Sequence, residues 1–484
     1  MKQVAVARCV MVLGTTSGAG KSWLATALCR WYARQGLKVA PFKAQNMSNN
    51  ARVVQGGEIG SAQYFQALAA RAEPDVRMNP LLLKPERDTH SQVVLLGRVD
   101  AELTRMPWHE RGATVWPAVA QALDALRADN DVVVIEGAGS PAEINLKHSD
   151  IVNMRVARHA DARCLLVTDI DRGGAFAHLY GTWALLDDAE RALLRGFVLN
   201  KFRGDASLLE PGPRMLEELT GIPTVATLPM WRQHGLPDED GVFDERSAHA
   251  GAVHKTVAIV AYPRISNLDE FQALKNVPGV RLVWARSAVD IAQADWVILP
   301  GSKHTSGDLA WLRSQGLDRA IAQHAQRGGA VLGICGGLQM LGEALIDTQG
   351  IDGNGPGLGL LPLVTVFDAE KLVKKTRARF GDVIGPWAAL SGAELSGYEI
   401  RNGRTSQHAG MGAGRVAIPG GLAWQNEQGN VLGVYLHGLF EDAGVLHALF
   451  GARVPTLESV FDGLADFIDA HFADGVIPEL ILKQ

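Results

Sequence analysis

The chain reads GTTSGAGKS over residues 14–22, and this stretch decides how its first half folds. An apolar run, Val4–Leu13, precedes it, and apolar residues at helical spacing follow over Lys21–Gln35. A strand, a glycine-rich turn and a Lys-Ser pair that opens a helix form the P-loop arrangement, in which backbone N–H groups converge on phosphate oxygens. The loop is a lengthened variant, because Thr15 stands where the first glycine is expected and Gly14 comes one residue earlier.

A nucleotide bound to this loop needs cations near its phosphates and a carboxylate for its metal ion. Lys21 is placed to reach the β- and γ-phosphates, and Ser22 to bind Mg²⁺. Glu136 ends an apolar run, so we expect its carboxylate at the sheet edge where doubly wound folds bind ligands. A solvated acid at a strand end is the alternative for this residue. The predicted ATP-binding residues are Thr15, Gly18, Gly20, Lys21, Ser22, Lys43 and Asn200, and the predicted metal ligands are Ser22 and Glu136.

Apolar runs alternate with helical patterns along both halves, which is typical of parallel sheets covered by helices. We therefore predict an α/β fold whose first half is a P-loop-type, doubly wound parallel sheet. The strands predicted in the first half are Val4–Leu13, Lys38–Phe42, Asp131–Ile135, Cys164–Thr168, Gly196–Asn200 and Thr224–Leu228. Those predicted in the second half are Val257–Ala261, Arg281–Ala285, Trp296–Leu299, Ala330–Ile334, Leu361–Phe367 and Val431–Leu436.

A polar stretch without periodicity separates the two halves and predicts a linker. We expect an ATP-binding domain over residues 1–235, the linker over 236–254, a second domain over 255–450 and a helical tail over 451–484. The segment 369–392 is basic and then rich in glycine and proline, which predicts a loop or a short inserted element.

Composition limits the function classes open to this chain. Lys and Arg number 47 and Asp and Glu 52, a net charge of −5, so there is no basic surplus for binding nucleic acid.

No uncharged apolar stretch reaches the ~18 residues of a membrane span, and no secretory leader follows Met1. Four cysteines without metal-ligand or CxxC spacing are too few for a disulfide framework in 484 residues, which favours the reducing cytoplasm. None of this predicts an oligomeric state.

One cysteine differs from the other three in its surroundings. Cys335 follows the apolar run Ala330–Ile334 in the pattern Gly-x-Cys-x-Gly, and a helical pattern begins after it. This is the nucleophile-elbow pattern, because only small neighbours permit the sharp turn that exposes the side chain. The N-terminus of the following helix favours the thiolate. We predict that Cys335 is a nucleophile, the alternative being a buried thiol on a glycine-rich turn, and we assign Cys9, Cys29 and Cys164 to the core.

A cysteine nucleophile needs a base and donors for an oxyanion. His437 ends the last predicted strand, so we expect it at the same sheet edge as Cys335. Glu441 is a candidate to orient the imidazole, although an acid in the first turn of the next helix is equally favourable. The backbone N–H groups of Gly301 and Gly336 are the predicted oxyanion hole.

Together the two halves predict a glutamine-dependent ligase that forms amides. An ATP site can convert a carboxylate to an acyl phosphate, and a thiolate can release ammonia from a carboxamide through a thioester. Ammonia then displaces the phosphate to form the amide.

Longer motifs add a resemblance to known families. Residues 299–302, 332–342 and 435–441 resemble the class I, triad-type glutamine amidotransferases of the cobyrinate amidase group. Gly14–Ser22, Lys43 and Glu136 resemble the dethiobiotin-synthetase-like ATPases. Over nearly its whole length the chain is similar to the cobyric acid synthase family. The motifs that carry this resemblance are KAQNMSNNA (43–51), NPLLLKPERDTHSQVVLLG (79–97), TDIDRGGAFA (168–177), NKFRGD (200–205), YPRISNLDEF (262–271), GYEIRNG (397–403) and YLHGLFE (435–441).

The resemblance implies a reaction and its participants. ATP and glutamine would amidate four peripheral carboxylates (b, d, e and g) of adenosylcobyrinic acid a,c-diamide, giving adenosylcobyric acid. Mg²⁺ would be the cofactor and the corrinoid the substrate, with no nucleic acid or membrane partner. The second half would be a class I amidotransferase-like α/β sheet, with Cys335 as nucleophile and His437 as second catalytic residue. Many such enzymes carry Glu two residues after the histidine, where this chain has Leu439, so the third catalytic residue stays open.

Other functions fit parts of the pattern. A P-loop switch protein of the septum-site or chromosome-partition type would carry a lysine five residues before Lys21, where this chain has Thr16. An amidotransferase of the same group could act on another carboxylate, such as the a and c groups of cobyrinic acid or a cell-wall lipid precursor. A stand-alone cysteine hydrolase would leave the ATP site without a role.

Overall fold

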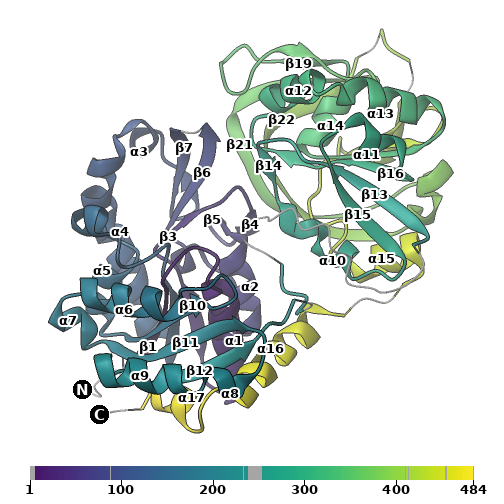
Figure 1. Cartoon of the computed structure of the whole chain (residues 1–484). Helices are drawn as coiled ribbons and strands as arrows, with labels where there is room; N and C mark the ends of the chain where they lie inside the picture. Colours follow the sequence, from purple (N-terminus) through teal and green to yellow (C-terminus); the bar gives the residue numbers. More distant parts are fainter. Residues whose placement is uncertain are drawn as a thin grey trace.

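A parallel β-sheet forms the centre of each half of the chain, and helices cover both sheets (Figure 1). This arrangement confirms the predicted α/β class. The computed structural model describes residues 6–87, 89–232, 234–237, 253–408, 410–412, 414–452 and 455–482. Most of the predicted linker over 236–254 lies outside the described residues.

The sheet of the first half brings the glycine loop to an open edge. Its strands run parallel, and each of the apolar runs predicted as strands in this half contributes one. The strands in spatial order are β12 (Thr224–Pro229), β11 (Leu194–Phe202), β10 (Arg163–Asp169), β1 (Arg8–Gly14), β9 (Val132–Glu136) and β2 (Val39–Phe42). Because β1 lies between β10 and β9, the loop after it opens where ligands bind in doubly wound sheets.

Helices bury apolar side chains against both faces of this sheet. On one face lie α1 (Lys21–Arg34) and α2 (Ser61–Ala69), and on the other lies the long helix α4 (Trp108–Asp129). The shorter helices of this half are α3 (Ala101–Arg105), α5 (Met154–Ala160), α6 (Ala175–Leu185), α7 (Asp188–Arg191), α8 (Ala206–Leu209) and α9 (Pro211–Thr220), with 3-10 turns at Val76–Met78 and Ile144–Ser149.

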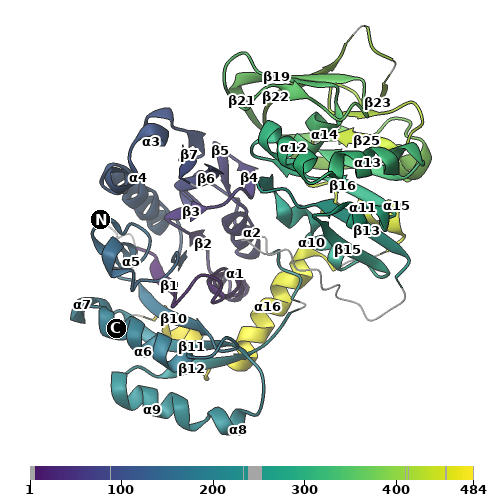
Figure 2. The same ribbon diagram turned by 45° about the horizontal axis from the view of Figure 1, so that its top comes forward.

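The C-terminal helix α16 (Leu457–His471) returns to the first half and lies along α1, as Figures 1 and 2 show. Its apolar face enters the core beneath α1, where Phe461 is completely buried. At the rim, Arg30 on α1 donates to Glu458 (2.5 Å) and Asp462 (2.7 Å) on α16. The short helix α17 (Val476–Glu479) follows, and Tyr32 donates to its Ile477 carbonyl (2.8 Å). The predicted helical tail therefore completes the core of the first half.

We expect Phe461→Ala to lower the free energy of unfolding by about 3–5 kcal/mol, the usual cost of emptying a buried aromatic site. Thermal or urea denaturation of the full chain, followed by far-ultraviolet circular dichroism, measures this loss. A substitution at Asp474, which is exposed on the same tail, serves as the control and should change stability little. Equal stability of the two variants would contradict the packing role assigned to α16.

Short strands in the first half contact the second half. A small sheet contains β3 (Gln45–Met47), β6 (Leu81–Arg87), β7 (His90–Leu95) and β8 (Arg98–Val99). Beside it, β4 (Ala51–Val54) and β5 (Gly57–Gly60) form an antiparallel hairpin that faces the second half (Figures 1 and 2). Glu58 on this hairpin pairs with Lys371 of the second half (2.5 Å) and with Lys84 (2.6 Å). The buried Glu58–Lys371 pair therefore links the two halves, whereas Lys84 belongs to the first half.

The sheet of the second half places Cys335 at the end of an interior strand. In spatial order its strands are β15 (Val280–Ala285), β13 (Lys255–Val260), β16 (Trp296–Leu299), β18 (Ala330–Ile334), β25 (Val431–Val434), β24 (Ala423–Gln425) and β23 (Arg415–Ile418). The strands from β15 to β25 are parallel, and β24 and β23 extend the sheet antiparallel. The helices around it are α10 (Gln272–Lys275), α11 (Ala288–Ala292), α12 (Thr305–Ser314), α13 (Leu317–Gln326), α14 (Gly336–Leu341) and α15 (Ala443–Phe450), with 3-10 turns at Leu268–Phe271 (η3) and Gly385–Leu390.

The segment 369–392 differs from its prediction as a loop or short insert. It contains the second part of the long strand β21 (Leu363–Arg379), which pairs antiparallel with β22 (Glu394–Gln407). Polar and apolar residues alternate only weakly along this strand because it is partly exposed, which hid the strand pattern. The remaining short strands are β14 (Ile265–Ser266), β17 (Gly301–Ser302), β19 (Ala344–Ile346) and β20 (Gly355–Pro356).

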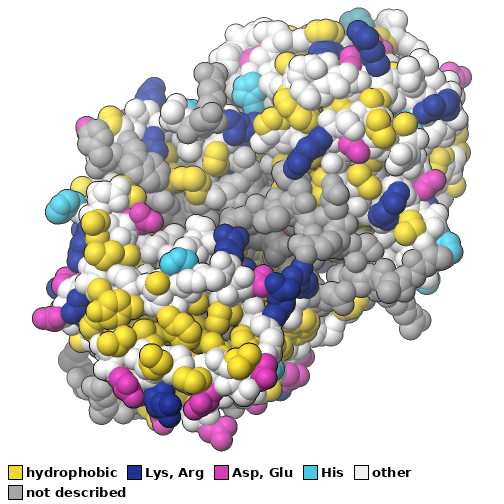
Figure 3. Space-filling model, in the orientation of Figure 1, with side chains coloured by type: hydrophobic (Ala, Val, Ile, Leu, Met, Phe, Trp, Pro, Cys, Tyr) yellow, Lys and Arg dark blue, Asp and Glu magenta, His cyan; other side chains and the backbone are white. Residues whose placement is uncertain are grey.

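Acidic and basic side chains are mixed over the face shown in Figure 3, in line with the small net charge. Among the described residues, no helix combines the length and apolar character needed to cross a bilayer.

Candidate functional site

The glycine loop between β1 and α1 forms the floor of a large cavity. Gly18 and Gly20 adopt positive φ angles of 72° and 106°. A Cβ at Gly20 would lie 2.1 Å from the amide nitrogen of Asn200, so this position accepts only glycine. The Asn200 amide donates to the Ala19 carbonyl (2.9 Å), and it therefore holds the loop in shape from the end of β11.

Lys21 folds back over the loop. Its ammonium donates to the carbonyls of Thr16 in the loop (3.0 Å) and of Gly139 after β9 (3.1 Å). Thr15 differs from its prediction as a phosphate ligand. Its N–H donates to Val167 and its hydroxyl to Thr168 on β10, so its hydrogen-bond donors face the sheet.

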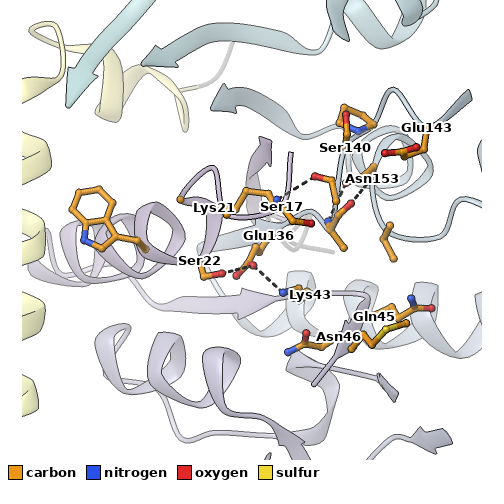
Figure 4. Close-up of a pocket in the computed structure, with 18 of the residues that line it drawn as sticks. Ser17, Lys21, Ser22, Lys43, Gln45, Asn46, Glu136, Ser140, Glu143 and Asn153 are labelled. Atoms are coloured by element: carbon orange, nitrogen blue, oxygen red, sulfur yellow. Dashed lines mark hydrogen bonds and ion pairs between the residues drawn. The ribbon is translucent and has the colours of Figure 1, made fainter. Parts of the chain in front are cut away.

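Glu136 at the end of β9 is the centre of the polar network next to the loop (Figure 4). This carboxylate is almost fully buried and accepts from the Ser22 hydroxyl (2.8 Å) and the Lys43 ammonium (2.9 Å). On its other oxygen it accepts from Gln66 (2.6 Å) and Gln63 (3.4 Å) of α2. The structure therefore brings Lys21, Ser22, Lys43 and Glu136 to one place, although they come from three separate segments.

This oxygen-rich corner suits the chemistry of Mg²⁺. The ion takes oxygen ligands in an octahedron and usually binds one or two carboxylates together with substrate phosphates and water. The Ser22 hydroxyl and the Glu136 carboxylate, 2.8 Å apart, supply two such oxygens beside the loop. The described residues contain no group of three or more His, Cys, Asp or Glu side chains that could hold a metal by themselves.

The cavity above the loop has a volume of about 1120 Å³. A ligand pocket for one small molecule usually spans about 300–1,000 Å³, so this cavity can hold a nucleotide and part of a second ligand. The sequence patterns did not indicate the second lobe, which is built by α4, the turn at Ile144–Ser149 and α5. Its lining includes the basic residues Arg111, Lys147, His148, Arg155 and Arg158 and the acids Glu143, Asp150 and Glu190, the last of which pairs with Lys147 (2.8 Å). Positive side chains around a cavity favour an anionic ligand.

In the second half, Cys335 occupies a strained turn between β18 and α14. Its φ and ψ angles are 51° and −103°, a conformation that is rare for a residue with a side chain and that is typical of functional turns. A Cβ at Gly337 would lie 1.9 Å from the Leu299 carbonyl, so this neighbour must be glycine for α14 to approach β16. The turn matches the nucleophile-elbow pattern predicted from the sequence.

His437 lies against Cys335 at the end of β25, and its imidazole is buried. Nδ1 lies 3.2 Å from Oε1 of Glu270, and the other carboxylate oxygen of Glu270 accepts from the Gly438 N–H (3.0 Å). Burial alone would lower the pKa of His437, but the Glu270 charge and the hydrogen bond to Cys335 outweigh it and raise the pKa to about 10. The site therefore favours a protonated imidazole beside the sulfur, an arrangement that stabilises a thiolate.

The acid beside His437 is Glu270 and not Glu441, which the sequence offered as a candidate. Glu441 lies four residues beyond the histidine and pairs with Arg52 of the first half (2.6 Å). Glu270 belongs to the motif YPRISNLDEF, but no local pattern distinguishes it from Asp269 as a partner for a histidine 167 residues away. Only the fold brings η3 to the sheet edge that carries His437.

The two glycines predicted for the oxyanion hole both line this site. A Cβ at Gly301 would lie 2.7 Å from Cε1 of His437, and one at Gly336 would lie 2.7 Å from the Ser302 N–H nitrogen. Gly336 is the first residue of α14, so its N–H points out of the helix N-terminus beside the sulfur. Cys9, Cys29 and Cys164 lie in the core of the first half, and burial raises the pKa of Cys9 to about 11 and that of Cys164 to about 12.

We expect Glu270→Gln to reduce glutamine hydrolysis by about 10²- to 10⁴-fold, because the neutral amide no longer orients His437 or stabilises its charge. Glu441→Gln, which affects the residue favoured by the sequence pattern, should cost less because Glu441 does not contact the imidazole. Steady-state measurement of glutamate release compares the two variants. A larger loss in Glu441→Gln would contradict the assignment of Glu270.

The raised pKa of His437 also predicts how stability depends on pH. The folded imidazole holds a proton between about pH 6.5 and about 10, whereas the unfolded one does not. Its contribution to the free energy of unfolding is therefore fully present below about pH 6.5 and is lost as the pH rises through about 10. Urea denaturation across this range should show a steeper decline for the wild-type chain than for His437→Asn, and parallel curves would exclude the linkage.

Comparison with known proteins identifies a family for each half of the chain. Residues 10–234 match the family model described as a CobQ/CobB/MinD/ParA nucleotide binding domain, and residues 256–445 match the CobB/CobQ-like glutamine amidotransferase domain. The chain is 78% identical to a cobyric acid synthase of Variovorax paradoxus over 98% of this chain and 99% of that protein. It is 76% identical to that of Polaromonas naphthalenivorans (98% and 99% covered) and 66% identical to that of Methylibium petroleiphilum (98% and 97% covered).

Proposed function

The chain belongs to the cobyric acid synthase family, and we propose that it amidates the b, d, e and g carboxylates of adenosylcobyrinic acid a,c-diamide to give adenosylcobyric acid. ATP would activate each carboxylate and glutamine would supply the nitrogen. The observation that carries this proposal is the presence, in one chain, of a nucleotide-sized cavity whose lining includes Arg111, Arg155 and Arg158 and of a buried Cys335–His437–Glu270 site.

In the first half, a substrate carboxylate attacks the γ-phosphorus of ATP, which forms an acyl phosphate and releases ADP. Lys21 and the N-terminus of α1 stabilise the charge that develops on the phosphate oxygens. Lys43, which pairs with Glu136 (2.9 Å), is placed to bring a second positive charge to the same region. Mg²⁺ held near Ser22 and Glu136 would neutralise phosphate charge. Ammonia then attacks the acyl carbon, and phosphate leaves.

In the second half, the Cys335 thiolate attacks the carboxamide carbon of glutamine. The N–H groups near Gly336 and Gly301 bind the oxyanion, and protonated His437 donates its proton to the leaving ammonia. Glu270 keeps the imidazole oriented and charged. Water then attacks the thioester with His437 as base, releasing glutamate and restoring the thiolate.

Three arginines in the lining of the cavity support a polycarboxylate substrate. Arg155 and Arg158 on α5 and Arg111 on α4 line its second lobe. Successive amidation removes the negative charges that these residues attract, so we expect the fully amidated product to bind more weakly than the starting corrinoid. The free cysteines of the described chain fit the reducing cytoplasm as the compartment of this reaction.

One assay tests the proposal. The protein is incubated with ATP, Mg²⁺, glutamine and the corrinoid a,c-diamide, and the corrinoid is followed by mass spectrometry. Four successive carboxylate-to-amide mass changes support the proposed reaction. ATP hydrolysis without a change in the corrinoid would refute it. Cobyrinic acid, supplied in a parallel incubation, shows whether the a and c carboxylates are substrates instead.

A further inference from the structure

The glutamine-hydrolysing site receives part of its support from the other half of the chain. Asn267 and Leu268 lie three and two residues before Glu270, at the start of η3. The Asn267 amide donates to the Ala51 carbonyl (2.8 Å), and the Leu268 N–H donates to the Asn50 side chain (2.9 Å). Strand β4 and the residue before it therefore hold the turn that presents Glu270.

Arg52 on β4 is the centre of this contact. Its side chain is almost fully buried, and its guanidinium pairs with both Asp269 and Glu441 of the second half. Asp269 is the residue next to Glu270, and Glu441 follows His437 by four positions. One guanidinium from the first half thus ties together the two segments that carry the acid and the base.

Arg52 is also connected to His437 through contacts with Tyr398 on β22. The guanidinium carbon of Arg52 lies 5.1 Å from the centre of the Tyr398 ring, in the range of a cation–π contact. Tyr398 stacks on His437, with ring centroids 5.3 Å apart and planes inclined by 22°. Its hydroxyl accepts from Asn267 (2.7 Å), and its backbone pairs with that of His437.

Helix α2 packs aromatic side chains against Arg52 and also contacts the nucleotide site. Tyr64 and Phe65 place their ring centres 5.6 Å and 5.0 Å from the guanidinium carbon of Arg52. The residues on either side of this pair, Gln63 and Gln66, donate to Glu136 beside the glycine loop. A single helix therefore contacts both the carboxylate of the ATP site and the arginine behind the cysteine site.

We propose that Arg52 is a positioning residue for glutamine hydrolysis, through which the ATP-binding half completes the Cys335–His437–Glu270 site. The inference rests on the proposed glutamine-hydrolysing function of this site. Arg52 acts through Asp269, Glu441 and Tyr398. Without its charge, two carboxylates remain beside Glu270 in a buried setting, and their repulsion moves η3 away from the imidazole.

The test compares Arg52→Gln and Arg52→Lys with a matched control, Arg30→Gln. Arg30 is equally buried and also pairs with two carboxylates, but it lies between α1 and α16, away from the cysteine site. For each variant we would measure glutamine hydrolysis, corrinoid amidation with ammonia, and the pH dependence of Cys335 alkylation by iodoacetamide.

We expect Arg52→Gln to lower kcat for glutamine hydrolysis by about 10²-fold, the usual cost of displacing a catalytic group by about 1 Å. Amidation with ammonia should persist, because the glycine loop is unchanged. Alkylation of Cys335 should shift to higher pH as the thiolate loses its oriented imidazolium. Arg52→Lys should recover part of the rate, since a lysine can pair with one carboxylate but not bridge two.

Several outcomes would overturn the proposal. Near-wild-type glutamine hydrolysis in Arg52→Gln would do so, as would an equal loss in Arg30→Gln. Loss of ammonia-dependent amidation in Arg52→Gln alone would assign this arginine to general folding. If the wild-type chain hydrolyses no glutamine, the proposed function fails, and the alkylation profile still decides whether Arg52 positions the site.

Discussion

Replacing Cys335 with alanine is expected to abolish amidation from glutamine and to leave amidation from ammonia close to the wild-type rate. The variant lacks the only sulfur at the strained turn between β18 and α14, so no thioester can form. Loss of a nucleophile in a comparable triad costs about 10⁴-fold or more in rate. The glycine loop and Glu136 belong to the other half and keep their geometry, so carboxylate activation continues.

Parallel assays with glutamine or with ammonium chloride measure both activities of Cys335→Ala. Cys164→Ala provides the control, because this thiol is buried in the core of the first half and should affect stability alone. Retention of glutamine-dependent amidation in Cys335→Ala would remove the cysteine from the mechanism. Loss of both activities would contradict the proposal that the second half hydrolyses glutamine while the first half activates the carboxylate.

Replacing Lys21 with alanine is expected to remove amidation from either nitrogen source by about 10³-fold or more, because the phosphoryl step depends on positive charge placed at the phosphate oxygens. The Lys21 ammonium lies beside the loop and donates to the carbonyls of Thr16 and Gly139. Glutamine hydrolysis needs no phosphate, so it should continue in this variant at a rate set by the second half.

Formation of ADP and of amidated corrinoid, followed together, reports the effect of Lys21→Ala. Lys38→Ala is a suitable control, since Lys38 is exposed at the start of β2 and lies outside the cavity. Undiminished amidation with ammonia in Lys21→Ala would exclude the glycine loop as the phosphate site.

The sequence predicts the two central sheets well because their strands are buried on both faces. Runs such as Val132–Ile135 and Ala330–Ile334 are continuously apolar, which is typical of interior parallel strands. The glycine loop and the elbow at Cys335 could also be located, since each depends on local backbone geometry that few residues other than glycine allow. Site residues defined by local turns are therefore visible in a single sequence.

Residues that act across the fold are not visible in this way. Glu270 lies on a 3-10 turn with no periodicity, and its neighbour Asp269 carries the same charge. Glu270 pairs with His437, and Asp269 pairs with Arg52 of the first half. The side of the turn on which each carboxylate lies decides its partner. The second part of β21, beyond the predicted strand Leu361–Phe367, was missed for a related reason, because it is exposed and lacks the apolar pattern of a buried strand.

The position of α16 has a consequence for biosynthesis. This helix, near the end of the chain, supplies buried side chains such as Phe461 and Ile468 to the core under α1, although about 400 residues separate the two helices in sequence. As the chain leaves the ribosome, the ATP-binding half emerges first but lacks this layer, whereas the amidotransferase half emerges with its own sheet complete. We therefore expect the middle of the polypeptide to reach its native packing before the beginning does, and we expect a chain cut between the halves to need both fragments present together.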